Sequence, residues 1–290
     1  MIFSEYKSGS SFEDAVVINN IDDSNPYTEI AAKTFLSKKS IREVTLPESI
    51  VKIGDWAFAH MKSLKRITIP ANNIVLGKEV FLDCPELKEI NIYPDMSENE
   101  GLGLLFATAF LVLKRNDLFT PKRASSKEEH INWVHDFDIA LIEYIGENDS
   151  KNFEPVLYGW FNDEGEDTQI LKYVNNVREV KSRLCFWRLR YNLYLDHDTE
   201  KYLMTYIKSH MPYGEKESEH TAAFDIIINE CCNDIEYFKI LYSSDGINTN
   251  TSNLLLDALQ KKGASPEISA FIMSKIKQDN STEAFAEFDL

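Results

Sequence analysis

Histidine and cysteine are the side chains of this chain best suited to metal or acid–base chemistry, because both can ligate metals and imidazole titrates near neutral pH. Two zinc ligands on a helix are normally four residues apart, whereas His130 and His135 are five apart and fall on different helix faces. The four cysteines include no CxxC pair, and Cys231 and Cys232 are adjacent, too close for an unstrained disulfide. The sequence therefore predicts no metal site, and this cysteine usage fits a reducing compartment.

Two short motifs are candidates for catalysis or cofactor binding. Asp196-His197-Asp198 could orient an imidazole as a general base, but a polar loop before a helix explains the same residues, and we favour the loop. The GLG at 101–103 lies between a predicted strand and a predicted helix. A dinucleotide fingerprint has a third glycine, however, where this chain has Phe106. We therefore expect no catalytic residues and no cofactor.

Charge is distributed unevenly along the chain. The net charge of −16 argues against nucleic acid and anionic membranes as partners, because both require clustered Lys and Arg. Residues 29–94 contain 10 Lys/Arg and 8 Asp/Glu, a balance of +2, whereas residues 95–290 contain 20 and 34, a balance of −14. This difference predicts a boundary near residue 95, with one domain at 1–95 and another at 96–290.

No segment of the sequence has the pattern of an export signal or a membrane span. The N-terminal stretch MIFSEYKSGSSFEDAVV lacks a basic region followed by an apolar run and a cleavage site. The most apolar window, LGLLFATAFLVL at 102–113, is shorter than the roughly 18–20 residues that a span needs, and is typical of a buried helix. We expect a cytoplasmic protein.

A repeat of 23 residues organises the segment 29–94 and must position any binding residues there. Phe35, Phe58 and Phe81 are 23 residues apart, and several apolar or small positions keep the same spacing. These positions are Ala31/Gly54/Gly77, Ile41/Leu64/Leu87, Val44/Ile67/Ile90 and Leu46/Ile69/Ile92. Such a period is typical of a solenoid, in which each unit buries its apolar face against its neighbours.

Each repeat unit is predicted to contain a strand and a turn. In REVTL and KRITI, apolar and polar residues alternate, which predicts strands with one buried face that pair in parallel. In the Ile-Gly-x-x-Ala-Phe stretch, the small residue would let backbones approach and the Phe would fill the interior. Ile18 and Ile21 match Ile41 and Val44 one unit earlier, which predicts an imperfect N-terminal cap.

The segment IVKIGDWAFAHMKSLKRITIP at 50–70 closely resembles the BspA-type leucine-rich repeat, whose units follow the pattern I-G-x-x-A-F-x-x-C-x-S-L-x-x-I-x-I-P. The matching residues are Gly54, Ala57, Phe58, Ser63, Leu64, Ile67, Ile69 and Pro70, with Cys84 at the cysteine position of the next copy. The resemblance covers 29–94. It implies a leucine-rich-repeat fold that binds other macromolecules, often at bacterial surfaces, and it carries over no catalytic residues.

Polar residues between the buried strand positions should line an exposed face of the sheet. Glu43, Arg66 and Glu89 would form a self-complementary charge ladder beside a second column of polar residues. The candidate binding residues are Glu43, Thr45, Trp56, Arg66, Thr68, Glu89, Asn91 and Tyr93, with the two aromatic residues as anchors near the edges of the face. The alternative is that these pairs only keep the sheet soluble, each contributing about 0.2–1 kcal/mol.

From residue 102 onward the hydrophobic period changes from two to about 3.6, which predicts helices. One apolar stripe comprises Ile170, Val174, Val177, Val180, Leu184 and Trp187. Ser126 and Glu129 form a capping-box pattern, and Gly263 and Ser265 mark a helical hairpin near the C-terminal end. The hairpin loosely resembles an ankyrin-type pair, although the T-P-L-H signature is absent.

These expectations combine into an α+β protein: a short leucine-rich-repeat solenoid with a parallel sheet, followed by an irregular, ankyrin-like α-helical array. The predicted function is a non-catalytic module that binds a protein partner. Two alternatives stay open. One is a hydrolase or transferase with its site between the two domains, and the other is an exported surface adhesin, which the resemblance implies.

Overall fold

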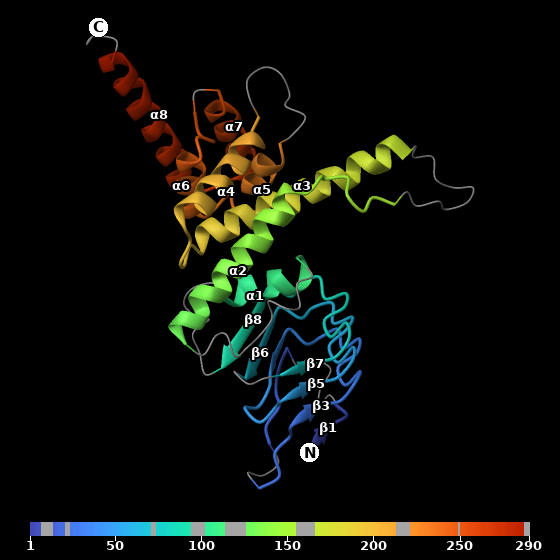
Figure 1. Cartoon of the computed structure of the whole chain (residues 1–290). Coiled ribbons are helices and arrows are strands. Elements are labelled where there is room, and N and C mark those ends of the chain that lie inside the picture. Colours follow the sequence, from blue (N-terminus) through green and yellow to red (C-terminus); the bar gives the residue numbers. More distant parts are fainter. Residues whose placement is uncertain are drawn as a thin grey trace. The chain divides into compact units, whose positions relative to one another are not determined.

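A computed structural model of the chain describes residues 1–6, 14–20, 24–70, 74–93, 102–113, 126–154, 166–212, 221–248 and 250–286 (Figure 1). The chain forms two compact units, Met1–Leu141 and Ile142–Leu290, and the division falls inside helix α2 (Lys127–Gly146). The repeat strands and helix α1 (Leu102–Leu111) belong to the first unit. The domain boundary near residue 95, which rests on composition, stays a prediction.

Two parallel sheets of short strands form the repeats of the first unit. One sheet has the order β2-β4-β6-β8 and the other β1-β3-β5-β7. The strands of the first sheet are β2 (Ala15–Val17), β4 (Glu43–Thr45), β6 (Arg66–Pro70) and β8 (Glu89–Tyr93). Those of the second are β1 (Ile2–Phe3), β3 (Glu29–Ile30), β5 (Lys52–Ile53) and β7 (Val75–Leu76). The predicted parallel-sheet solenoid is confirmed, and the second sheet was not anticipated.

A column of phenylalanines fills the interior of the solenoid. Phe35 and Phe58 are 0% exposed and Phe81 is 2% exposed. Their rings stack with centroids 5.1 Å and 5.7 Å apart. Phe3 and Tyr6 stack on Phe35 at 5.9 Å and 5.1 Å, so aromatic rings continue the column toward the N-terminus. The predicted column is confirmed.

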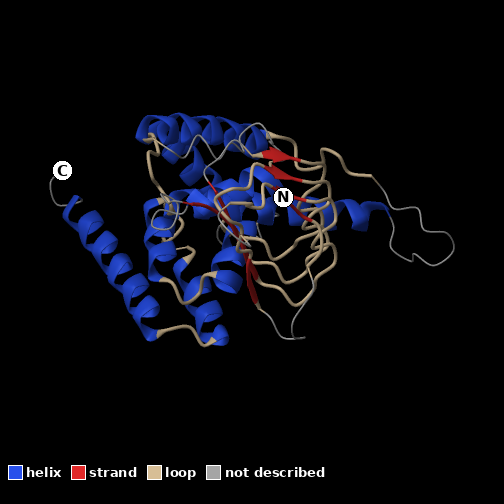
Figure 2. Cartoon of the chain, turned by 90° about the horizontal axis from the view of Figure 1, so that it is seen from below, coloured by secondary structure: helices blue, strands red, loops and turns tan. Residues whose placement is uncertain are grey.

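The turns that connect the strands stack backbone on backbone, as the coils in Figure 2 show. A Cβ on Gly54 would lie 2.5 Å from the backbone nitrogen of Ala32, and one on Gly77 would lie 2.5 Å from that of Asp55. Real Cβ atoms do not approach backbone so closely. The prediction that a small residue lets successive turns meet is therefore confirmed.

The first turn of the solenoid has a different register from the one predicted. Val16, not Ile21, lies opposite Val44, and the backbone N–H of Ile18 donates to the carbonyl of Thr45 at 3.0 Å. This step is 28 residues long, because the first turn contains more residues than the 23-residue turns that follow. The predicted pairing of Ile18 and Ile21 with Ile41 and Val44 was wrong, and Ile21 itself lies outside the described residues.

Helices α1 and α2 pack in the first unit. Helix α1 contacts β8, the last strand of its sheet, and Gly103 allows the close approach, because a Cβ there would lie 2.4 Å from Oδ1 of Asn91. Phe106 of α1 and Trp133 of α2 are both buried, with ring centroids 4.3 Å apart. The apolar window at 102–113 therefore forms a buried helix, as predicted. No helix in the described part of the chain is long and apolar enough to cross a membrane.

The second unit is a stack of helical hairpins. Its helices are α3 (Glu166–Arg190), α4 (His197–Ser209), α5 (Ala222–Glu230), α6 (Ile235–Ser243), α7 (Ser252–Lys262) and α8 (Pro266–Ala286). Helix α5 contacts α3 and α7, and α6 contacts α4 and α8, so like helices of successive hairpins pack together. Gly263, with φ 69°, ends α7, and Oγ of Ser265 accepts the N–H of Glu267 at 3.3 Å. The predicted hairpin is present, and its ankyrin-like character stays a prediction.

Candidate interaction surface

The outward side of the β4-β6-β8 sheet carries the predicted charge ladder. Glu43, Arg66 and Glu89 lie opposite one another in register. Nε of Arg66 donates to Oε2 of Glu89 at 2.5 Å, and Nη1 of Arg66 lies 3.5 Å from Oε1 of Glu43. The three side chains are between 40% and 50% exposed. The ladder is therefore ordered by its own ion pairs and still accessible from solvent.

The neighbouring polar column is only partly exposed. Thr45, Thr68 and Asn91 lie opposite one another, as predicted. Thr45 and Thr68 are half-buried, but Asn91 is 8% exposed. The expectation that Asn91 lines the exposed face was wrong, because α1 returns over β8 and brings Gly103 against the amide of Asn91.

The two predicted aromatic anchors are not part of this surface as described. Trp56 follows β5, a strand of the other sheet, and has a left-handed backbone with φ 51°. Nε1 of Trp56 donates to Oε2 of Glu79 at 2.7 Å, and Nζ of Lys33 lies 5.3 Å from the ring centroid. Tyr93 ends β8, but its side chain lies outside the described residues. We define the sheet face as Glu43, Thr45, Arg66, Thr68 and Glu89.

The Asp196-His197-Asp198 motif forms a helix cap. Oδ1 of Asp196 accepts the backbone N–H groups of Asp198 and Thr199 at 3.0 Å and 2.9 Å, at the start of α4. The hydrogen bond from the backbone of Thr199 is the main reason why the pKa of Asp196 is below its usual value. The side chain of His197 is 86% exposed. The preferred interpretation, a polar loop before a helix, holds for Asp196, whereas His197 and Asp198 are the first two residues of α4.

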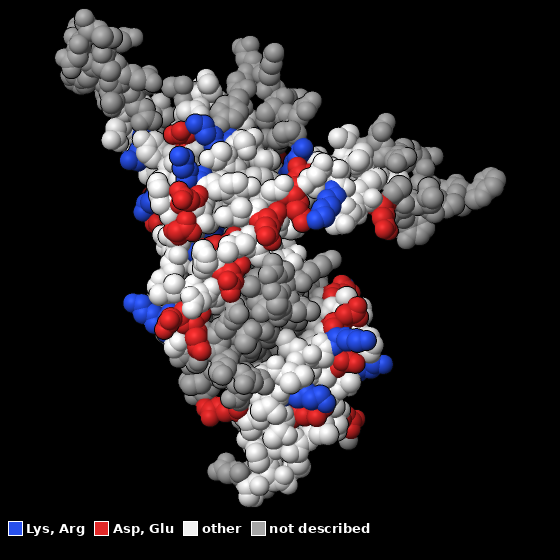
Figure 3. Space-filling model, in the orientation of Figure 1, with Lys and Arg blue, Asp and Glu red and all other residues white. Residues whose placement is uncertain are grey.

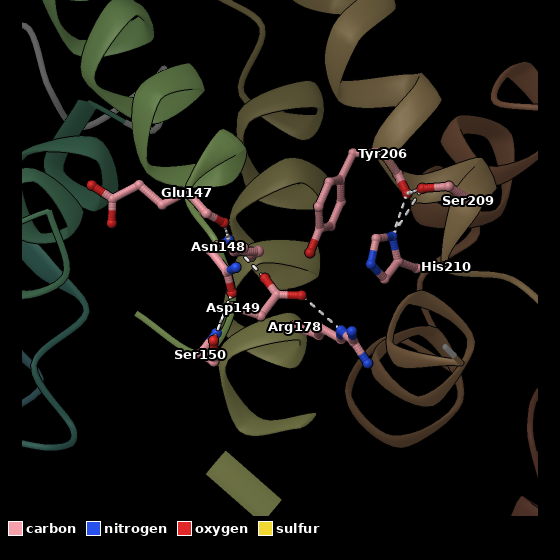
Figure 4. Close-up of polar contacts among 9 residues, drawn as sticks. Glu147, Asn148, Asp149, Ser150, Arg178, Tyr206, Ser209 and His210 are labelled. Carbon is pink, nitrogen blue, oxygen red and sulfur yellow. Dashed lines mark hydrogen bonds and ion pairs between the residues drawn. The ribbon is translucent and has the colours of Figure 1, made fainter. Parts of the chain in front are cut away.

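An ionic cluster in the second unit that includes the half-buried Asp149 and Arg178 (Figure 4) was not predicted from the sequence. Lys181 has a side chain only 1% exposed, and its Nζ donates to Oδ1 of Asp149 at 2.8 Å and to the carbonyl of Glu147 at 2.6 Å. Nε of Arg178 donates to Oδ2 of Asp149 at 2.7 Å. Burial by itself would raise the pKa of Asp149, but the hydrogen bonds from Lys181 and Arg178 hold that pKa below its usual value.

This cluster is arranged to hold the chain after α2 against α3 rather than to transfer protons. Asp149 is already paired with two cations, and burial together with the charge of Asp149 raises the pKa of nearby Tyr206. The Tyr206 ring stacks on His210 with centroids 4.0 Å apart. A usable sequence signal existed, because Lys181 falls on the apolar stripe between Val177 and Leu184, where a lysine must be buried with a partner.

The described cysteines and acidic residues offer no metal site. Within the described ranges, no group of three or more His, Cys, Asp or Glu side chains is placed to hold a metal ion. Cys84 is buried and donates its thiol to the carbonyl of Phe58 at 3.1 Å. Burial raises the pKa of Cys84 to about 11. The family's cysteine position is thus occupied here by a structural thiol.

Comparison with known proteins finds a family whose model matches the repeats. The model of the BspA type leucine rich repeat region matches residues 8–101 in six copies. The crystal structure of a leucine-rich repeat protein of T. pallidum (TpLRR) shares 31% sequence identity, covering 31% of this chain and 40% of that one, with a TM-score of 0.28. The chain thus spans less than half the length of that protein. No curated protein matches the chain. The family match identifies residues 8–101 as a leucine-rich repeat region of BspA type, a family that suggests protein interaction.

Proposed function

We propose that this protein is a non-catalytic interaction module that binds another protein through the sheet face. The observation that carries the proposal is Arg66, which lies at the centre of the face, paired with a glutamate on either side and 43% exposed. Arginine is enriched among the residues that dominate binding energy at protein interfaces. Membership of the repeat region in a family that implies protein interaction supports the same function.

The ion pairs of the ladder prepare the face for binding. Ordering a long side chain at an interface costs about 0.5–1.5 kcal/mol, and this cost falls when the side chain is already held in place. Glu43, Arg66 and Glu89 hold one another in the free protein. A partner would therefore meet an ordered pattern of alternating charge, which favours recognition of a complementary pattern.

We further propose that the protein works in the cytoplasm. The free cysteines support this location, because a reducing compartment keeps thiols unpaired. Fractionation of the native cells, followed by immunoblotting, would test it. Recovery of the chain from the cell surface would contradict this location and favour the adhesin alternative.

Affinity capture from the native cell tests the sheet face. The tagged full-length chain is compared with Arg66→Gln, which removes the central charge without placing three carboxylates in a row. Lys78→Gln is the matched control, because it removes one positive charge from the turn after β7, outside the sheet face. We expect Arg66→Gln to lose a partner that the wild type and Lys78→Gln both retain. Equal capture by all three proteins would contradict the proposal.

A further inference from the structure

Charged residues at equivalent positions of the solenoid are generally paired with the opposite charge. Nζ of Lys52 lies 2.8 Å from Oε1 of Glu29 one turn earlier, and the sheet face alternates acid and base. Figure 3 shows acidic and basic side chains lying next to one another over the visible part of the solenoid. By contrast, Arg42, Lys65 and Lys88 put a positive charge at the same position of three successive turns. We call these three residues the basic column.

The basic column runs along one border of the sheet face. Each member immediately precedes a residue of the charge ladder in the sequence. Backbone hydrogen bonds fix the order, since the N–H of Lys65 donates to the carbonyl of Arg42 at 2.7 Å and the N–H of Lys88 to that of Lys65 at 3.0 Å. All three residues are exposed. Any protein that docks on the ladder would therefore also lie over this border.

Most of this positive charge is unpaired within the described residues. Nη1 of Arg42 lies 3.4 Å from Oδ2 of Asp14, and both side chains are more than half exposed. The side chains of Lys65 and Lys88 have no hydrogen bond or ion pair to any described residue. Like charges at equivalent positions just before neighbouring strands repel, so this arrangement opposes stacking of the turns instead of assisting it. An acidic partner would remove that repulsion.

We propose that the basic column receives an acidic helix of the protein partner; this inference rests on the proposed function of the sheet face. The spacing favours a helix. Strands lie about 4.8 Å apart, so the three positions span about 9.6 Å. Carboxylates at positions i, i+4 and i+7 of a helix lie on one side and span about 10.5 Å, whereas those at i, i+2 and i+4 of an extended strand span about 13 Å.

The electrostatics of the whole chain favour an acidic protein segment over nucleic acid. The chain carries a net charge of −16, which would repel a long polyanion away from the basic column. A helix of two turns contacts only the column and its surroundings. Binding should therefore be local, dependent on Lys65 and Lys88 and weakened by salt.

Fluorescence anisotropy with designed peptides tests the inference on the full-length chain. The probe is a labelled Ala-rich helical peptide with Glu at i, i+4 and i+7, and the matched peptide has the same composition with its Glu residues spread over different faces. The column variant, Lys65→Gln/Lys88→Gln, removes two charges of the basic column, and Lys78→Gln/Lys262→Gln removes two exposed lysines elsewhere. At low ionic strength we expect the peptide with Glu at i, i+4 and i+7 to bind the wild type more tightly than the matched peptide does. Its affinity for Lys65→Gln/Lys88→Gln should be about two- to thirty-fold lower than for the wild type.

The outcomes separate this inference from the proposed function. Equal binding of both peptides, or of wild type and column variant, overturns the acidic-helix inference. Tighter binding of a single-stranded DNA oligonucleotide that also depends on Lys65 and Lys88 would overturn it in favour of nucleic acid. If Arg66→Gln loses the cellular partner while the column variant keeps it, the sheet face binds but the inference fails. If both variants keep the partner, the proposed function fails as well.

Discussion

Among truncations in the column of phenylalanines, Phe58→Ala should lower the stability of the solenoid most. Phe58 is 0% exposed and its ring stacks on Phe35 and Phe81 at 5.1 Å and 5.7 Å. Truncating a buried Phe costs about 3–5 kcal/mol. Because each aromatic pair can contribute about 0.5–1.5 kcal/mol beyond burial, the loss of two pairs places this change toward the upper end. Phe3→Ala should cost less, because Phe3 is only half-buried and sits at the end of the column.

Native-state hydrogen exchange is the appropriate assay, because a chain with two compact units need not unfold in one step. The backbone N–H of Phe58 donates to the carbonyl of Val80 at 3.0 Å, and that of Ala57 to Gly54 at 3.3 Å, so both amides report on the stacked turns. A loss of 3–5 kcal/mol should speed exchange in the peptide that covers 50–70 about 150- to 5,000-fold, provided that it exchanges through opening of the solenoid. Acceleration below about five-fold would refute the idea that the ring supports both neighbouring turns.

Three other perturbations test separate parts of the structure. Gly54→Ala should destabilise the solenoid by about 1–3 kcal/mol, because the new methyl group would meet backbone atoms of the preceding turn. Gly263→Ala has open space around the new methyl group and should cost about 1 kcal/mol, because alanine disfavours a φ of 69°. Urea denaturation monitored by hydrogen exchange compares the two variants. Asp149→Asn should destabilise the second unit by about 3–5 kcal/mol because Lys181 stays buried. Folding lowers the pKa of Asp149, so the wild type should lose the stabilisation linked to its ionisation as pH falls below about 4, and the variant should lack that acid dependence in a pH series of thermal melts. Cys84, whose pKa burial raises to about 11, should resist a thiol reagent at pH 8 until urea opens the solenoid, and rapid labelling of native protein would contradict its buried placement.

The solenoid was predictable from the sequence because the residues that specify it recur at a fixed spacing within a short segment. Phe35, Phe58 and Phe81 recur at one spacing, and a fixed spacing places each on the next once the strands pair in parallel. The same spacing set Glu43 against Arg66 and Arg66 against Glu89. The cap at Ser265 followed for a similar reason, since the residues that form it are adjacent in the chain.

The remaining features depend on segments that meet only in the folded protein. Asn91 is buried because α1 returns over β8, an event that the alternation within β8 does not encode. Val16 rather than Ile21 faces Val44 because the first turn is longer, so a single spacing misplaces it. Lys181 is buried because Asp149, 32 residues earlier, neutralises its charge. Periodic burial was thus determined by the sequence itself, whereas tertiary packing decided which polar side chains are covered, paired or left facing solvent.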